Sequence, residues 1–101
     1  MAEWSLRHVY TEKEVKRYAP TTGGVYRLYE SQEIQAPFYV GKTDSLEKRL
    51  LEHLSPSEPD ECIKRYLRNI CYFDYARVDS ESERDRIERE EIERFNPECN
   101  G

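Results

Sequence analysis

A glutamate near the C-terminus occupies a position where an apolar residue is expected. Residues 80–83 read Ser-Glu-Ser-Glu, a capping-box pattern, and predict a helix over residues 81–95. At about 100° per residue, Glu88 falls inside the apolar arc that Ile87 and Ile92 help to define. A carboxylate that faces a protein core must be paired with a cation, bind a metal ion or line a cavity.

Helical geometry leaves two interpretations of this glutamate. The first is an ion pair with Arg84, which lies one turn earlier inside the same arc. The second is a functional carboxylate, and geometry alone favours the ion pair over it. Glu91 also falls inside the arc, whereas Glu90 and Glu93 point to solvent.

Two tyrosine–glycine pairs form a second candidate set. They are Gly24-Val25-Tyr26 and Tyr39-Val40-Gly41, each within a segment of strand-like composition. Glycine weakens a strand and often marks the close approach of a ligand or another backbone, so the pairs suggest a site. The alternative is an aromatic sheet core, because the chain has eight tyrosines.

Basic side chains lie on two further predicted helices. One, over residues 45–54, carries Arg49 and His53 one turn apart beside its leucine stripe. The next has an apolar arc formed by Cys62, Ile63, Tyr66, Leu67 and Ile70. Its other face carries Lys64, Arg65 and Arg68, a compact basic cluster suited to nucleic-acid phosphates or, alternatively, a solvated helix face.

The remaining elements complete an α+β domain. A capping box at Thr11 predicts a short first helix, and residues 25–29, 38–43 and 71–78 read as strands. The first two strands are close in sequence and most simply form an antiparallel hairpin. We therefore expect a small three-stranded antiparallel sheet flanked by helices, with residues 1–101 forming a single domain.

Composition and cysteine usage limit the class of protein. With 37% hydrophobic and 37% charged residues and no long apolar run, we expect a cytoplasmic protein without a membrane segment. Cys62, Cys71 and Cys99 are odd in number and lack metal-ligand spacing. They are predicted to be reduced, partly buried thiols rather than a disulfide framework or a zinc site.

The net charge of −5, taken as a whole, argues against a nucleic-acid binder. The distribution of the charges along the chain weakens that argument. Residues 1–72 hold 11 basic and 11 acidic side chains, whereas residues 73–101 hold 5 basic and 10 acidic ones. The acidic surplus is thus confined to the last strand and helix. Because salt at physiological concentration screens charges over about 8 Å, an acidic face does not prevent another face of the molecule from binding phosphates.

These residues resemble the motifs of the GIY-YIG nuclease domain family over about residues 20–100. Gly24-Val25-Tyr26 and Tyr39-Val40-Gly41 are similar to the two motifs that name the family. Arg49 follows Gly41 by eight residues, where the family has its catalytic arginine, and His53 follows one turn later. Glu88 precedes Pro97 by nine residues, which matches the family's metal-binding glutamate, and Asn100 resembles its closing asparagine.

The resemblance implies a fold and a reaction. The family fold is a three-stranded antiparallel sheet flanked by helices, and its members hydrolyse DNA phosphodiester bonds with one divalent metal ion. Glu88 would then hold a single Mg²⁺ or Mn²⁺, and Arg49 would bind the phosphate. Gly24, Gly41, Lys42 and Asn100 would support the site.

The resemblance makes Tyr26 the predicted base, with Tyr39 completing the site. Lowering a tyrosine pKa from about 10 by about 3 units requires roughly 4 kcal/mol of cation stabilisation. Arg49, the metal ion and Lys42 would supply it, although strict strand alternation points Lys42 away from Tyr39. His53, with a usual pKa near 6.5, is the rival base or, alternatively, a hydrogen-bonded residue at the helix border.

The leading hypothesis is a metal-dependent endonuclease that nicks DNA in repair, recombination or mobile-element biology. A chain of this length has no room for a separate recognition domain, so we expect a DNA structure, a protein partner or an oligomer to direct it. Two alternatives stay open: a non-catalytic module that binds nucleic acid or protein, and a nuclease whose substrate is RNA.

Overall fold

The computed structural model describes residues 2–101. The elements in chain order are β1 (His8–Val9), α1 (Glu12–Tyr18), β2 (Gly24–Tyr29), β3 (Tyr39–Thr43), α2 (Leu46–His53), α3 (Glu61–Tyr66), β4 (Tyr72–Arg77), α4 (Glu81–Phe95) and the 3₁₀ helix η1 (Glu98–Asn100). Thr11, Ser45 and Ser80 cap α1, α2 and α4 through their side-chain oxygens, and the sequence predicts the caps at Thr11 and Ser80. None of the helices in the described part of the chain is long and apolar enough to span a bilayer.

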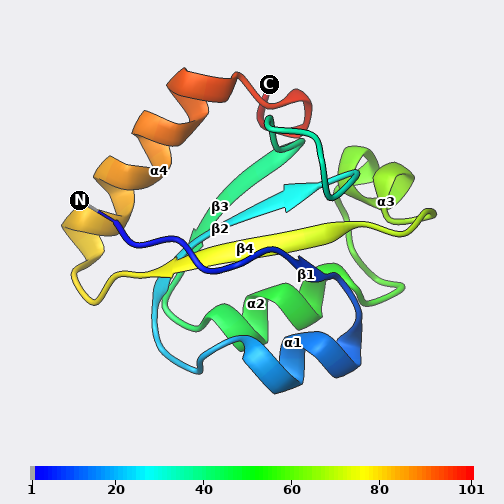
Figure 1. Ribbon diagram of the computed structural model, residues 1–101, viewed down its shortest axis with the longest axis horizontal. Coiled ribbons are helices and arrows are strands. Elements are labelled where there is room, and N and C mark those ends of the chain that lie inside the picture. Colours follow the sequence, from blue (N-terminus) through cyan, green and yellow to red (C-terminus); the bar gives the residue numbers. More distant parts are fainter. Residues whose placement is uncertain (1) are drawn as a thin grey trace.

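The sheet is antiparallel with the strand order β1-β4-β2-β3, so β3 lies at one edge (Figure 1). The predicted hairpin is present, because β2 pairs with β3 along its length. The sheet has four strands rather than the predicted three. The extra strand, β1, has only two residues, which is too short for an alternating pattern to reveal it.

Helices cover both faces of this sheet. In Figure 1, α1 and α2 lie on one side of it and α4 on the other. Tyr26 and Leu28 of β2 pack with Leu46 and Leu50 of α2 in the larger core cluster. Val25 points to the opposite face and packs in a second cluster with residues of β3 and α4. Successive residues of β2 therefore serve two different layers.

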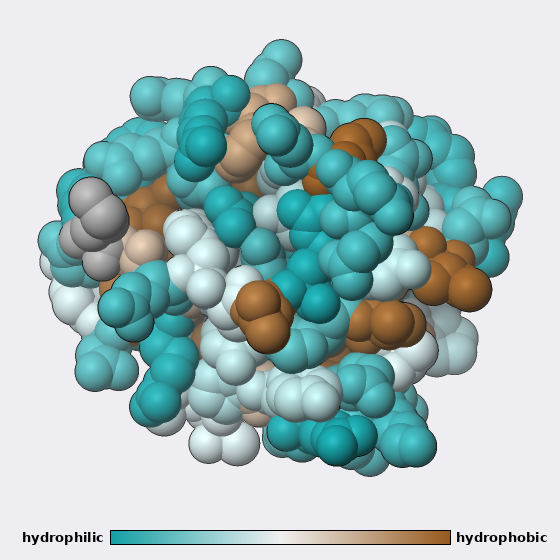
Figure 2. All heavy atoms as spheres, in the orientation of Figure 1, coloured by the Kyte–Doolittle hydropathy of each residue, from teal (hydrophilic) through white to brown (hydrophobic). Residues whose placement is uncertain are grey.

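The α3 region differs from its prediction. The helix ends at Tyr66, and Leu67 caps it, so the periodicity that placed Ile70 on the apolar arc stops early. Ile70 is 71% exposed. Figure 2 shows such apolar side chains as separate small patches on a largely hydrophilic face.

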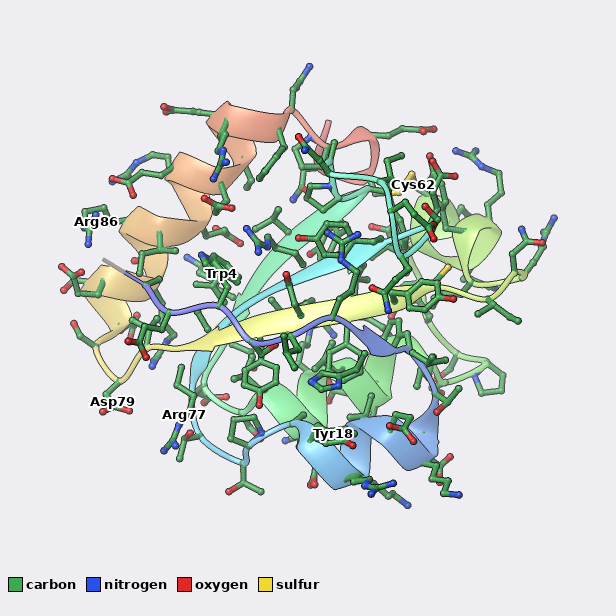
Figure 3. The ribbon with its side chains drawn as sticks, viewed as in Figure 1. Trp4, Tyr18, Cys62, Arg77, Asp79 and Arg86 are labelled. Carbon is green, nitrogen blue, oxygen red and sulfur yellow. A yellow bond between two sulfur atoms is a disulfide. The ribbon has the colours of Figure 1, made fainter. Side chains whose placement is uncertain are left out.

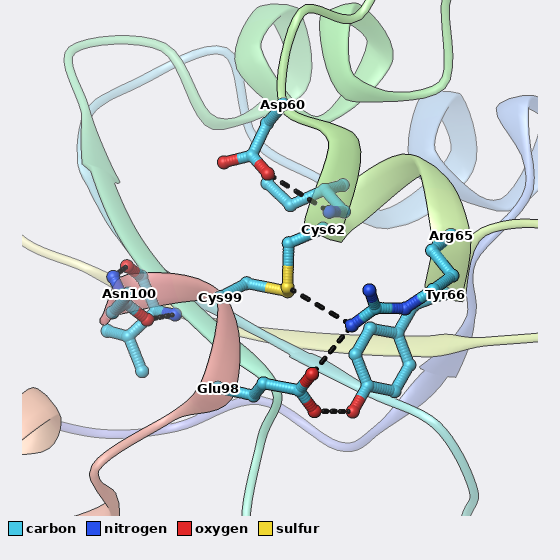
Figure 4. Close-up of a disulfide and its surroundings, with 9 residues drawn as sticks. Asp60, Cys62, Arg65, Tyr66, Glu98, Cys99 and Asn100 are labelled. Atoms are coloured by element: carbon cyan, nitrogen blue, oxygen red, sulfur yellow. Dashed lines mark hydrogen bonds and ion pairs between the residues drawn. A yellow bond between two sulfur atoms is a disulfide. The ribbon is translucent and has the colours of Figure 1, made fainter.

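The predicted reduced state of the cysteines is wrong for two of the three. Cys62 of α3 and Cys99 of η1 form a disulfide across 37 positions of sequence (Figure 4). No short spacing signals this bond, since only the tertiary fold brings η1 against α3. Cys71 is a free, buried thiol, and burial raises its pKa to about 11, which keeps it unreactive.

Candidate active site

Two glycines determine how closely β2, β3 and their neighbours approach. A Cβ atom at Gly41 would lie 2.4 Å from the hydroxyl oxygen of Tyr26. A Cβ atom at Gly24 would lie 2.2 Å from the carbonyl oxygen of Ala76 in β4. Both glycines therefore provide space for close contacts, as the sequence suggests, and Gly41 leaves room for the Tyr26 ring.

Four of the predicted site residues come together beside β3. Tyr26 and Tyr39 have ring centroids 6.1 Å apart, and each ring lies within 6 Å of the His53 ring. Arg49, half-buried one turn before His53 on α2, acts electrostatically on both tyrosines. The structure thus joins Tyr26, Tyr39, Arg49 and His53 in one cluster on the α2 side of the sheet.

The two predicted rivals for the base are hydrogen-bonded to each other. The Tyr26 hydroxyl lies 2.7 Å from Nε2 of His53, and both side chains are buried. Burial raises the pKa of Tyr26 well above its usual value, and Arg49 opposes the shift. Burial, helped by Arg49, lowers the pKa of His53, so the imidazole is neutral at neutral pH and able to accept a proton.

Exposure differs between the two tyrosines. Tyr26 has 0% exposed surface, whereas Tyr39 is partly exposed at the edge strand. Burial raises the pKa of Tyr39, while Arg49 and the Tyr26 hydroxyl oppose the shift. Tyr39 is therefore the tyrosine that reaches the surface, and Tyr26 lies behind it.

Glu88 lies on α4, across β3 from the tyrosines. The predicted ion pair with Arg84 is absent from the described residues, because Arg84 donates instead to the carbonyl oxygens of Val78 and Asp79 at 2.8 and 3.0 Å. Burial raises the pKa of Glu88. No side chain among residues 2–101 forms a hydrogen bond or ion pair with its carboxylate, which lines an open depression with Lys42 and Asp85.

Lys42 follows strand alternation and points away from Tyr39. Its Nζ pairs with Asp85 Oδ1 of α4 at 2.5 Å, and its charge moderates the raised pKa of Glu88. Lys42 therefore acts on the carboxylate side of β3 rather than on the tyrosines. Glu88 in turn raises the pKa of Tyr39, so the two sides of β3 are electrostatically linked.

The residues of this site fit a single cation. No cluster of three or more histidine, cysteine, aspartate or glutamate side chains that would form a protein-only metal cage occurs within residues 2–101. Glu88 offers a half-buried carboxylate that has no ion-pair partner within residues 2–101, and Asp85 beside it is neutralised by Lys42. One carboxylate with open coordination positions suits Mg²⁺ or Mn²⁺, which keep several waters and accept substrate phosphate oxygens.

The predicted phosphate-binding cluster of α3 is divided by the fold. Lys64 and Arg68 line an open pocket together with His53. Arg65 points elsewhere and pairs with Glu98 at 2.6 Å, beside the disulfide (Figure 4). Two of the three basic residues therefore lie next to the tyrosine cluster, and the third holds η1.

Asn100 fastens the C-terminus to the edge strand. Its amide oxygen accepts from the Val40 N–H at 2.8 Å, and its amide nitrogen donates to the Val40 carbonyl at 2.9 Å. This supports β3 between Tyr39 and Gly41. Asn100 thus anchors η1 to β3 and does not belong to the tyrosine cluster.

Glu58 was not predicted from the sequence. Its carboxylate is buried, and Oε2 lies 2.9 Å from Nδ1 of His53. The residue belongs to the Ser- and Pro-rich break after α2, where an acidic side chain is normally solvated. Its position between Pro56 and Pro59, five residues after His53, was the one available signal.

Comparison with known proteins agrees with this arrangement. Residues 22–101 match the family described as "UvrC-like GIY-YIG domain". The chain is 34% identical over 82 residues to UvrABC system protein C of Rickettsia rickettsii (strain Sheila Smith). These matched residues make up 81% of this chain and 12% of that protein. The corresponding protein of Rickettsia bellii is 32% identical over 81 residues. The chain spans about an eighth of the length of these relatives.

A solved structure has the same fold. The GIY-YIG N-terminal endonuclease domain of UvrC from Thermotoga maritima, bound to magnesium, superposes with a TM-score of 0.71 at 24% identity, covering 90% of this chain and 100% of that one. The predicted α+β fold and the predicted GIY-YIG nuclease resemblance are both confirmed. With its motifs gathered around β3 and the family match spanning residues 22–101, the chain belongs to the UvrC-like GIY-YIG domain family.

Proposed function

We propose that this chain is a divalent-metal-dependent endonuclease domain that incises DNA in excision repair. The observation that carries the proposal is the joined cluster of Tyr26, Tyr39, Arg49 and His53, which holds a neutral proton acceptor beside a surface tyrosine and a cation. The relatives are components of a UvrABC system, which supports a cytoplasmic repair role and delivery to DNA by partner proteins.

Arg49 binds the scissile phosphate in this proposal. Its side chain is partly exposed, and its pair with Glu52, at 3.2 Å on the helix surface, is weak enough to be exchanged for phosphate. The planar guanidinium donates two parallel hydrogen bonds to phosphate oxygens. These bonds strengthen as negative charge develops during attack.

The proton of the attacking water leaves through the row of hydroxyls behind the surface. Tyr39 takes this proton and passes its own to Tyr26, whose proton moves to Nε2 of His53 at 2.7 Å. The water oxygen forms a bond to phosphorus, the bond from phosphorus to the leaving oxygen breaks, and solvent protonates that oxygen. Because Tyr26 has no exposed surface, this row replaces the simpler prediction in which Tyr26 contacts water itself.

β3 is the edge strand, so a phosphate at this edge can meet groups from both faces of the sheet. Glu88 would hold the metal ion there from the α4 side, where Lys42 pairs with Asp85. When bound, a Mg²⁺ or Mn²⁺ ion supplies Lewis-acid stabilisation of the phosphate charge. Lys64 and Arg68, beside His53, would contact neighbouring backbone phosphates, and Arg65 would not, since Glu98 engages it. None of these groups is arranged to distinguish bases, so we expect recognition of a DNA structure or a protein complex rather than a sequence.

A cleavage assay tests this function. Supercoiled plasmid and single-stranded RNA are incubated with the protein in Mg²⁺, Mn²⁺ or chelator, alongside Glu88→Ala and Arg49→Ala. We expect metal-dependent nicking of the plasmid, reduced about 10²- to 10³-fold by Arg49→Ala and at least as strongly by Glu88→Ala. Glu90→Ala is the matched control, because Glu90 lies two residues away and pairs with Arg86 on the exposed face.

The other outcomes separate the alternatives. Nicking that neither substitution reduces would contradict the mechanism. Cleavage of RNA in preference to the plasmid would change the substrate. A labelled duplex that shifts in a gel without cleavage in any metal would favour the binding module.

A further inference from the structure

Glu58 is buried in a turn that serves no other part of the proposed site. It is 4% exposed and lies in the segment between α2 and α3, with prolines at positions 56 and 59. The turn is closed by backbone hydrogen bonds, including Glu58 N–H to the Ser55 carbonyl at 3.1 Å. Placing an acidic side chain here is costly unless its oxygens are satisfied.

Both carboxylate oxygens of Glu58 are satisfied. Oε1 accepts the backbone N–H of Asp60 at 3.1 Å, and Oε2 lies 2.9 Å from Nδ1 of His53. Asp60 in turn caps α3 through its own side chain. The carboxylate is therefore held in one orientation by the chain itself, with one oxygen directed at the imidazole.

This geometry determines which nitrogen of His53 carries the proton. An ionised carboxylate has no proton to donate, so Nδ1 must donate to Glu58. Burial and Arg49 lower the pKa of His53, which leaves the ring neutral with a single proton, on Nδ1. Nε2 then has a free lone pair, and it faces the Tyr26 hydroxyl at 2.7 Å.

We propose that Glu58 is a positioning residue for phosphodiester cleavage, which holds His53 in the Nδ1–H tautomer and stabilises the imidazolium formed when the Tyr26 proton arrives. The inference rests on the proposed function. In the step, the hydroxyl O–H bond of Tyr26 breaks, an N–H bond forms at Nε2, and the positive charge lies beside the Glu58 carboxylate. A carboxylate that orients a base in this way need not gain a proton itself.

The charges around the imidazole support this role. Arg49 of α2 disfavours the imidazolium, whereas Glu58 favours it, with a smaller contribution from Asp60. The other groups that face the ring are Tyr26 of β2 and Tyr39 of β3. Lys64 of α3 and Arg68, which follows the end of that helix, line an open pocket with His53. Within residues 2–101, Glu58 is the one anion in hydrogen-bond contact with His53.

The test replaces the carboxylate with a group of the same shape. In Glu58→Gln, the amide offers either an oxygen or an NH₂ group to Nδ1, so the tautomer is no longer held. We expect kcat for plasmid nicking to fall at least about tenfold while KM for DNA stays within about twofold. Loss of the negative charge also lowers the pKa of His53, so the acid limb of the pH profile moves to lower pH. Glu90→Gln, an exposed change of equal charge, should leave kcat and the acid limb unchanged.

Coupling distinguishes positioning from a structural role. If Glu58 acts through His53, Glu58→Gln should reduce the rate no further in a His53→Ala background. A turn that merely supports the fold would give additive losses and raise KM. An unchanged kcat in Glu58→Gln, or additive losses, would overturn the inference.

A spectroscopic measurement is independent of cleavage and needs no variant of Glu58. Long-range ¹H–¹⁵N NMR at neutral pH reports which imidazole nitrogen is protonated, and His53→Ala assigns the signals of the two histidines. We expect a protonated Nδ1 and an unprotonated Nε2 at His53, and a protonated Nε2 would refute the inference. If the wild-type protein shows this tautomer but cleaves nothing, the proposed function fails while the assigned geometry of Glu58 and His53 stands.

Discussion

Tyr26 and Arg27 are neighbours on β2, and each is buried in a polar network on opposite faces of the same sheet. On the α4 side, Arg27 donates to both oxygens of Asp74 at 2.9 and 2.7 Å and to Glu91 at 2.7 Å. Trp4 stacks on the guanidinium at 3.6 Å, and Figure 3 shows it over the sheet on the side of α4. All the charges in this network have partners, and it is closed to substrate.

The network on the α2 side is a row with an open end. Hydrogen bonds join buried Glu58 to His53 and His53 to Tyr26, and the Tyr26 ring lies 6.1 Å from that of partly exposed Tyr39, with Arg49 beside them. Its central histidine is neutral and able to accept a proton. Burial of polar groups alone therefore does not indicate a site, whereas an uncompensated group with access to the surface does.

Two of the carboxylates of α4 show the same contrast. Glu91 and Glu88 both lie on the predicted apolar arc, but Glu91 is paired with Arg27 and Glu88 has no protein counter-ion in the described residues. The outer face of this helix is solvated, and Arg86 points away from the sheet there (Figure 3).

The largest expected effect comes from removing the Tyr26 hydroxyl, which lies in the network on the α2 side of the sheet. Tyr26→Phe should lower the nicking rate about 10²- to 10⁴-fold, because proton transfer to His53 is lost. The matched control is Tyr29→Phe, on the same strand but the opposite face, where the hydroxyl binds Asp74 at 3.1 Å. It should cost about 1 kcal/mol of stability and leave the rate unchanged. Equal rate losses in the two variants would erase the distinction between the faces.

Substitutions in the network of Arg27, Asp74 and Glu91 should change the stability of the protein rather than its cleavage rate. Arg27→Met leaves Asp74 and Glu91 buried without a cation and should reduce the free energy of unfolding by about 3–5 kcal/mol, measured by urea denaturation. The rate per folded molecule should stay close to wild type. Adding Asp74→Leu and Glu91→Leu should restore most of the stability, and a failure to do so would mean that the pairing itself is the main contribution.

Reduction of the disulfide should have an intermediate effect. Opening the Cys62–Cys99 bond removes a constraint on the unfolded chain worth about 2–4 kcal/mol and should lower the melting temperature. Thermal unfolding with and without reductant measures it. The double variant Cys62→Ser, Cys99→Ser should have the melting temperature of the reduced protein, and reductant should not change it. A melting temperature of the wild type that is insensitive to reductant would contradict the bond.

The smallest expected effect is the pH dependence of the cleavage rate, which depends on the protonation of His53. Activity requires neutral His53, so it should fall about tenfold per unit as pH falls through the His53 pKa, which lies below its usual value near 6.5. Because this pKa is lowered on folding, the stability contribution of His53 is also lost over that range as pH falls. His8→Gln is the control, since His8 stacks on Tyr18 outside the site, and it should keep the acid limb. If the acid limb disappears in His8→Gln, the group that titrates is His8 rather than His53.

Local patterns were enough to predict much of the protein. The capping residues Thr11, Ser45 and Ser80 and the periodicity of α2 and α4 depend on interactions within a few residues, so they can be predicted from sequence. The spacing of Tyr26, Tyr39 and Arg49 indicated the family, and the position of Glu88 on its arc indicated a carboxylate in need of a partner.

The tertiary structure decided what local patterns could not reach. Three features depend on how loops and termini pack, which is set by distant contacts rather than by period or propensity. They are the choice between an ion pair with Arg84 and an available carboxylate at Glu88, the bond between Cys62 and Cys99, and the contact of Glu58 with His53. The sequence by itself therefore determined most of the elements, apart from β1, and the chemical groups of the site, apart from Glu58. Only the fold decided which of those groups are paired and which remain available to react, because partners separated by tens of residues meet only when the sheet and its helices are assembled.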